Sequence, residues 1–103
     1  MENLASVEQF EQVRKHGKVV FNFTADWCPD CHFIDPFMGE IEKEFKDITF
    51  ISVDRDQFID LCIDLDIYGI PSFLAYENGE EKARFVSKDR KTREEIESFL
   101  QTI

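Results

Sequence analysis

The sequence predicts an α/β domain in which helices flank a central mixed β-sheet, with elements in the order αβαβαββα. Two observations lead to this fold class. The runs 18–25 and 48–54 are rich in β-branched and aromatic residues and enclose an amphipathic stretch at about 29–45, which is the pattern of a right-handed parallel βαβ unit. Farther along, Asn78-Gly79 is a strong hairpin signal and predicts that the last two strands are antiparallel.

The elements of the first half follow from capping and periodicity. Ser6 and Gln9 have the spacing of a capping box, and the apolar residues after them recur at helical intervals, so a helix is expected over 6–15. The run 18–25 is almost continuously apolar, as in a central strand that is covered on both faces. In the helix at 29–45, apolar side chains recur every four residues: Phe33, Phe37, Ile41 and Phe45.

The second half is predicted in the same way. Asp56 is a candidate N-cap for a short helix at about 57–65. A strand at 72–77 and its hairpin partner at 81–87 follow. The Thr-Arg-Glu-Glu segment at 92–95 repeats the capping-box pattern, and the apolar residues after it share one face of the last helix: Ile96, Phe99 and Leu100.

Length and charge restrict the function. The 103 residues correspond to one domain. There are 12 Lys and Arg against 22 Asp and Glu, so the formal net charge is −10, and no basic surface is expected for nucleic acid or for anionic membranes. The N-terminus lacks a leader pattern and no apolar run is long enough to cross a bilayer, so neither secretion nor membrane insertion is expected.

Two cysteines carry the chemical signal. Cys28 and Cys31 are three residues apart where the second helix begins, and the unpaired N–H groups and dipole of a helix start stabilise a thiolate. The spacing places Cys31 one turn behind Cys28, close enough to resolve a mixed disulfide. Pro29 suits the first helical position because its missing N–H costs nothing there. The pair therefore predicts thiol–disulfide exchange.

A zinc site is the alternative for this pair. Such a site needs about four ligands, and only Cys62, His16 and His32 remain, so no metal is expected. Cys62 lies in an apolar helical stripe and is expected to be a small buried hydrophobe, with a regulatory or intermolecular role as the alternative. An unpaired cysteine suits a reducing compartment better than an oxidising one, which indicates the cytoplasm.

Together with motifs elsewhere in the chain, the cysteine pair resembles the thioredoxin family. The motifs occur in the family's order and span most of the chain, so the resemblance implies a thioredoxin fold over residues 1–103. The WCPDC motif, in place of the more usual WCGPC, is similar to that of small cytosolic thioredoxin-related proteins that act on a narrower set of disulfides. The matching segments are Ala25-Asp26-Trp27-Cys28-Pro29-Asp30-Cys31, Pro36, Gly69-Ile70-Pro71-Ser72 and Glu77-Asn78-Gly79-Glu80.

The resemblance also implies roles for individual residues. Cys28 would be the attacking cysteine and Cys31 the buried resolving one, while Trp27 would shield the disulfide and contact partners. Pro71 would follow a cis peptide bond, and the backbone of Ile70 would pair with an extended substrate segment. The implied activity is that of a thiol–disulfide oxidoreductase that reduces disulfides in proteins or small thiol compounds. It needs no dissociable cofactor and is recycled by a reductase, by resemblance a flavoprotein.

Three departures from the family pattern bear on the rate of this reaction. Asn22 stands where the family has a buried Asp that helps to move the proton of the resolving thiol, and Asn cannot be a general base. Phe50 replaces the Lys that accompanies that Asp, and the segment 87–91 lacks the glycine expected before the last helix. We therefore expect slower resolution of the mixed disulfide than in a member that carries the acid.

Acidic residues surround the first cysteine in the sequence. Asp30 lies between the cysteines, with Asp26 and Asp35 nearby, and their charges are expected to raise the pKa of Cys28. His32 would act in the opposite direction if its imidazolium approached Cys28. Weaker thiolate stabilisation makes a weaker oxidant, so a reducing couple is predicted. The basic cluster before the last helix is expected to be a solvated connector: Lys88, Arg90, Lys91 and Arg93.

Two other functions stay open. A non-catalytic interaction module could keep the family's groove while its redox couple is slow or unused, and Asn22 motivates that alternative. An oxidase or isomerase is the other alternative, against which the acidic surroundings of Cys28 and the absence of a secretion signal both argue. Core packing is the alternative role for Trp27, and a hydrogen-bonded core amide is the alternative for Asn22.

Overall fold

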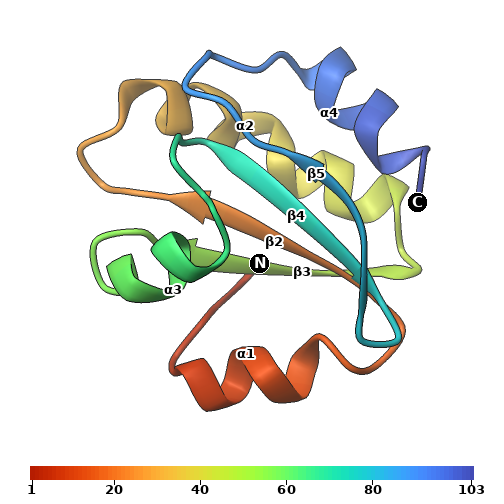
Figure 1. Cartoon of the computed structure of the whole chain (residues 1–103). Helices are drawn as coiled ribbons and strands as arrows, with labels where there is room; N and C mark the ends of the chain where they lie inside the picture. Colours follow the sequence, from red (N-terminus) through yellow and green to blue (C-terminus); the bar gives the residue numbers. More distant parts are fainter.

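Five strands form one mixed sheet in the computed structural model, which describes residues 1–103 (Figure 1). The strands are β1 Glu2–Asn3, β2 Lys18–Thr24, β3 Ile48–Asp54, β4 Ser72–Glu77 and β5 Glu80–Phe85. Their order across the sheet is β1-β3-β2-β4-β5, which places β2 in the centre as predicted. β2 pairs in parallel with β3 and antiparallel with β4, so the prediction of a mixed sheet is confirmed.

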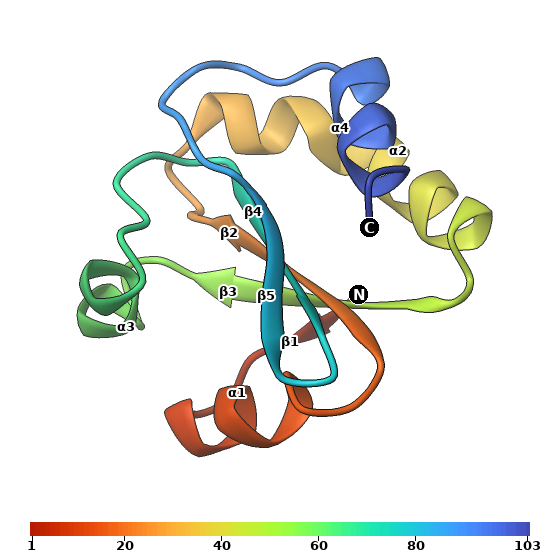
Figure 2. The ribbon, with the colours of Figure 1, turned by 45° about the vertical axis from the view of Figure 1, so that its right-hand side comes forward.

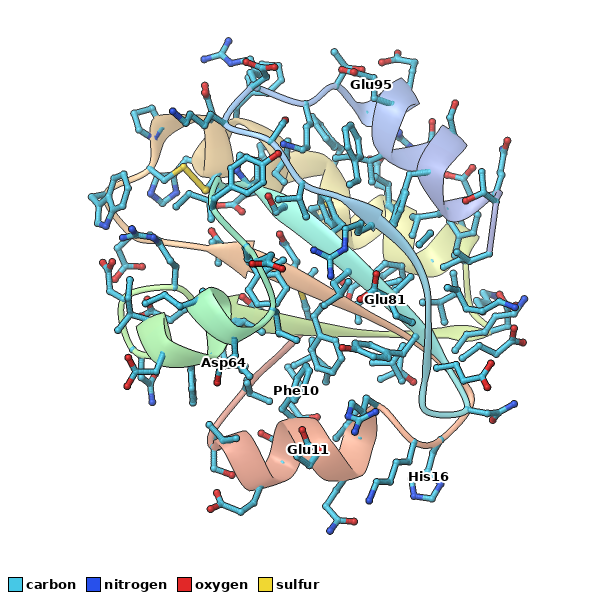
Figure 3. The ribbon with its side chains drawn as sticks, viewed as in Figure 1. Phe10, Glu11, His16, Asp64, Glu81 and Glu95 are labelled. Carbon is cyan, nitrogen blue, oxygen red and sulfur yellow. A yellow bond between two sulfur atoms is a disulfide. The ribbon has the colours of Figure 1, made fainter.

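Two helices cover each face of the sheet (Figure 2). One layer holds α1 Val7–Val13 and α3 Ile59–Asp64, and the other holds α2 Pro29–Glu44 and α4 Arg93–Leu100. Phe21 and Phe23 of β2 pack in the cluster with α1 and α3, whereas Val20 packs in the cluster with α2 and α4. Phe10 extends from α1 toward the sheet, and its ring centroid lies 4.7 Å from that of Phe21 (Figure 3). Burial of β2 on both faces explains why its sequence is almost continuously apolar.

Local signals in the second half act as predicted. β3 and β4 have the predicted bounds. Asn78 and Gly79 have φ values of 51° and 93°, the positive values that both central residues of a tight type I′ hairpin require. At the start of α4 both hydrogen bonds of the capping box form, because the Glu95 N–H donates to Thr92 Oγ1 and the Thr92 N–H donates to Glu95 Oε1. No helix has the length and apolar character needed to cross a membrane.

Four details of the fold differ from the prediction. α1 ends at Val13, two residues before the expected end, and β5 covers Glu80–Phe85 instead of 81–87. The element order begins with an additional strand, β1, which pairs in parallel with β3; its two exposed residues are too few to show a strand periodicity. The third helix begins at Ile59, and Asp56 does not cap it. Instead, Asp54 Oδ1 accepts hydrogen bonds from the backbone N–H groups of Asp56 and Gln57. The carboxylate of Asp54 thus stabilises the turn before α3, and no side chain caps the helix itself.

Candidate active site at the start of helix α2

A disulfide between Cys28 and Cys31 lies at the N-terminus of α2, seen in Figure 3 as a yellow bond. The two Cα atoms are 5.2 Å apart. Cys28 is the N-cap residue with an extended backbone, and its Sγ accepts a hydrogen bond from the Cys31 N–H at 3.2 Å. Pro29 occupies the first helical position, as predicted. A negative charge on Cys28 Sγ is therefore stabilised by a backbone N–H donor and by the positive end of the helix dipole.

The two sulfurs differ in access to the surface. Cys28 lines a groove with a volume of about 340 Å³, together with Trp27, Tyr68, Ile70 and Lys88; we call this the active-site groove. Both residues are buried, with Cys28 4% exposed and Cys31 1% exposed, but only Cys28 lines the groove. A substrate disulfide that enters the groove can therefore reach the first sulfur and not the second.

Trp27 stands at the edge of the groove with 59% of its surface exposed, so it is not a core residue. Its Nε1–H donates a hydrogen bond to Asp56 Oδ2 at 2.7 Å. The guanidinium of Arg55 lies 5.8 Å from the ring centre and pairs with the same Asp56 at 3.2 Å. These contacts fix the orientation of an indole face that remains available to a partner.

The opposite wall of the groove comes from the segment before β4. The peptide bond between Ile70 and Pro71 is cis, and the Ile70 side chain packs against the cysteine pair. Gly69 lies so close to the backbone of Ser87 that a Cβ at this position would be 2.5 Å from the Ser87 carbonyl carbon and oxygen. Only glycine permits this approach, which places loop 86–92, the connection between β5 and α4, directly against the wall of the groove.

The prediction that the basic cluster is a solvated connector is wrong for Lys91. This side chain is 1% exposed, and burial lowers its pKa. Its Nζ donates to Ser87 O at 3.3 Å, to Ser87 Oγ at 3.1 Å and to Asp89 O at 3.0 Å. One feature of the sequence could have indicated the burial of Lys91. This residue directly precedes the N-cap of α4, and side chains at that position often pack against the helix.

Arg90 is exposed, as predicted, and it also connects the loop to the cysteine motif. Its Nε donates to Asp30 Oδ1 at 2.8 Å, and its guanidinium lies 4.3 Å from the ring centre of Phe33. Asp30 is thus half of an ion pair and not an isolated anion beside Cys28. The predicted effect of Asp30 on the pKa of Cys28 stays a prediction, and Arg90 opposes it.

His32 is held by two hydrogen bonds at the outer side of α2. Its Nε2 lies 2.5 Å from the Asp26 carbonyl oxygen and its Nδ1 lies 3.1 Å from Asp35 Oδ2. The hydrogen bond to the Asp26 carbonyl, and then that to the Asp35 carboxylate, raise the pKa of His32. The imidazolium donates both bonds at once, so the charged form fits this site best.

Behind α2, Asn22 is buried in β2 and its Oδ1 has no hydrogen-bond partner. It lines a second cavity of about 330 Å³ between β2 and α2, together with Asp35, Glu42 and Ser52; we call this the inner pocket. A buried amide oxygen without a partner, beside a polar cavity, fits an ordered water molecule.

Cys62 is buried and unpaired, as predicted, and burial raises its pKa. It lies on α3 and belongs neither to the active-site groove nor to the inner pocket. No three His, Cys, Asp or Glu side chains come together in an arrangement that could hold a metal ion.

Three features come together here: a disulfide at the start of a helix, a mixed sheet, and a cis-proline loop that packs near the disulfide. This combination is that of a thiol–disulfide oxidoreductase. The sequence profile described as thioredoxin matches residues 2–102. The chain therefore belongs to the thioredoxin family, and the sequence-based assignment is confirmed.

Individual relatives agree with this assignment. The chain is 35% identical over 80 residues to Thioredoxin H-type from Fagopyrum esculentum, a match that covers 77% of this chain and 69% of that protein. It is 40% identical over 82 residues to Thioredoxin H-type from Brassica campestris, covering 80% and 64% respectively. The chain thus spans about two thirds of the length of these two relatives. The crystal structure of thioredoxin from Trypanosoma brucei brucei superimposes with a TM-score of 0.86 at 25% identity, covering 96% of this chain and 86% of that one.

Proposed function

We propose that this protein is a disulfide reductase that acts on protein or small-thiol disulfides. The Cys28 thiolate attacks a substrate disulfide, which releases one substrate thiolate and forms a mixed disulfide. Cys31 then loses its proton and attacks Cys28 Sγ, which releases the second substrate thiolate and forms the Cys28–Cys31 disulfide. The observation that carries this order of events is that Cys28 lines the active-site groove and Cys31 does not.

The surrounding residues support the proposal in separate ways. The exposed indole of Trp27 offers a contact face to the substrate, and the backbone of Ile70, next to Pro71, can pair with an extended substrate segment as an added strand. Asn22 cannot accept the proton of Cys31, so water takes that role.

Turnover also needs a partner and a reducing environment. The cysteine pair carries the two electrons itself, so no dissociable cofactor takes part, and a separate reductase, by family resemblance a flavoprotein, returns the disulfide to the dithiol. The unpaired Cys62 supports a reducing compartment, and we place the protein in the cytoplasm.

The equilibrium between the dithiol and a defined thiol/disulfide buffer tests the proposal, with alkylation and mass spectrometry as the readout. We expect an intramolecular disulfide with a potential near that typical of thioredoxin, about −270 mV. In parallel, Cys31→Ser is expected to trap mixed disulfides with substrates, whereas Cys28→Ser traps none. A distinctly oxidising potential would favour an oxidase or isomerase, and failure to exchange would favour the interaction module that Asn22 motivates.

A further inference from the structure

A third pocket, largely apolar and formed in part by α3, adjoins the active-site groove. It has a volume of about 400 Å³, and its apolar lining includes Ile59, Ile63 and Ile67. Arg55 and Tyr68 line both this pocket and the active-site groove. The two hollows are therefore neighbours on one continuous surface, which we call the α3 surface where it covers Arg55, Ile59, Ile63 and Tyr68.

The α3 surface exposes large apolar side chains that are not part of the hydrophobic core. Tyr68 is 70% exposed and Ile63 is 66% exposed, and Ile59 is exposed as well. The core contacts of α3 are made by Leu61 and Cys62, so one helix face already satisfies the packing of this element. Apolar side chains that gather on a second face, beside a substrate groove, are typical of an interaction surface.

Acidic residues border the α3 surface. Asp60, Asp64 and Asp66 are exposed, and Asp66 lines the pocket itself; Figure 3 labels Asp64 at this border. None of the three takes part in an ion pair. Together with the net charge of −10, these free carboxylates favour a partner that carries positive charge.

We propose that the α3 surface is a second docking site for protein substrates that carry an apolar side chain flanked by Lys or Arg near the reducible disulfide. The proposal rests on the proposed function, because the α3 surface continues the groove in which the disulfide is reduced. The apolar side chain fills the pocket between Ile59 and Ile63, and the flanking cations pair with the aspartates at its border. Small disulfides enter the active-site groove alone and gain nothing from this surface.

Synthetic peptides test the proposal. Each peptide contains one internal disulfide and, three to ten residues away, either a Lys-Leu-Lys or a Glu-Ser-Glu segment, and oxidised glutathione serves as the small substrate. We expect kcat/KM to be about tenfold higher for the best Lys-Leu-Lys peptide than for its Glu-Ser-Glu counterpart. Ile63→Gln is expected to abolish most of this preference and to leave the reduction of oxidised glutathione unchanged. Val7→Gln is the matched control, because Val7 is 46% exposed on α1, and it should retain the preference.

A binding measurement separates failure of this proposal from failure of the proposed function. The protein has one tryptophan, at the edge of the groove, so its fluorescence reports docking of the same peptides with their cysteines replaced by serine. Selective docking that Ile63→Gln removes supports the α3 surface even if no disulfide is reduced. Equal binding of both peptide types overturns it, as does a dimer in sedimentation experiments that Ile63→Gln dissociates, since the α3 surface would then hold a second copy of the chain.

Discussion

The active-site groove and the inner pocket differ in how their polar groups are satisfied; we call them the groove side and the inner side. On the groove side, each carboxylate has a partner: Asp30 pairs with Arg90, and Asp56 accepts a hydrogen bond from the indole of Trp27. On the inner side, the side-chain oxygen of Asn22 is buried without a partner, next to a polar cavity. The groove side is thus electrostatically compensated, whereas the inner side contains an unfilled hydrogen-bonding position.

This difference indicates which changes will have large effects. A charge added or removed on the groove side is screened by solvent and by the ion that remains, so its influence on Cys28 is modest. A charge placed at position 22 is buried, and water screens it poorly. Substitutions on the inner side should therefore change both stability and the proton transfer from Cys31, while those on the groove side should mainly adjust the thiolate of Cys28.

An acid on the inner side is expected to have the largest effect. Asn22→Asp buries a carboxyl group at a position that is 4% exposed, so desolvation raises its pKa. We expect a loss of about 2–4 kcal/mol in unfolding free energy at neutral pH. Because the folded pKa is the raised one, the loss is absent below the pH at which the unfolded carboxyl titrates, and it is complete once the pH rises through the folded pKa. Urea unfolding across this pH range measures it.

The same variant tests the proton transfer. Above the folded pKa the new carboxylate can accept the Cys31 proton, so the mixed disulfide should resolve faster than in the parent protein, as acid-quenched time courses would show. Asn22→Leu is the matched control, since it has a similar size and no titratable group, and its stability should not depend on pH in this range. Equal resolution rates in the parent and in Asn22→Asp at high pH would contradict a role for the inner side in proton transfer.

On the groove side, the close approach of loop 86–92 is the feature whose disruption should cost most. Gly69→Ala places a Cβ 2.5 Å from the carbonyl group of Ser87. Because these are backbone atoms, they cannot move aside as the end of a flexible side chain would. We expect a loss of about 2–3 kcal/mol and a higher KM for peptide substrates. Gly39→Ala is the control: it lies in α2 with nothing within 4 Å of the new Cβ, so it should stabilise the protein by about 0.5–1 kcal/mol. Thermal unfolding of both variants measures these changes in stability.

Much of the fold could be predicted because its signals are local. The strands and the capping box of α4 depend on short periodic patterns, and the cysteine spacing identifies the helix start without further information. Loop 86–92 could not be predicted in this way. The burial of Lys91 depends on acceptors that fold back around its ammonium, and the contact of Arg90 joins residues that are 60 positions apart. The unpartnered oxygen of Asn22 likewise follows from how β2 and α2 pack together.

The ion pair between Asp30 and Arg90 should have a smaller, reciprocal effect on Cys28. Asp30→Asn leaves an unpaired cation beside the thiol and should lower the pKa of Cys28, while Arg90→Met leaves an unpaired anion and should raise it, and both effects are small because the two groups are partly exposed. The double variant should return close to the parent value. Thiolate absorbance of the reduced protein as a function of pH measures all four. An unchanged or raised pKa in Asp30→Asn would show that this carboxylate does not act on Cys28.

The smallest expected effect concerns His32, because its side chain and that of its partner Asp35 are both exposed. Its pKa is raised above the ordinary 6.5, so the pair with Asp35 contributes stability below that pH and loses its contribution as the pH rises through the folded pKa. Asp35→Asn should lower the pKa of His32 only in part, because the Asp26 carbonyl, the larger cause, remains. An NMR titration of the imidazole measures this, with the resonances of His16 as the internal control. If the pKa of His32 fell to its ordinary value in Asp35→Asn, Asp35 would account for the whole shift. If the pKa did not fall, the Asp26 carbonyl alone would account for it.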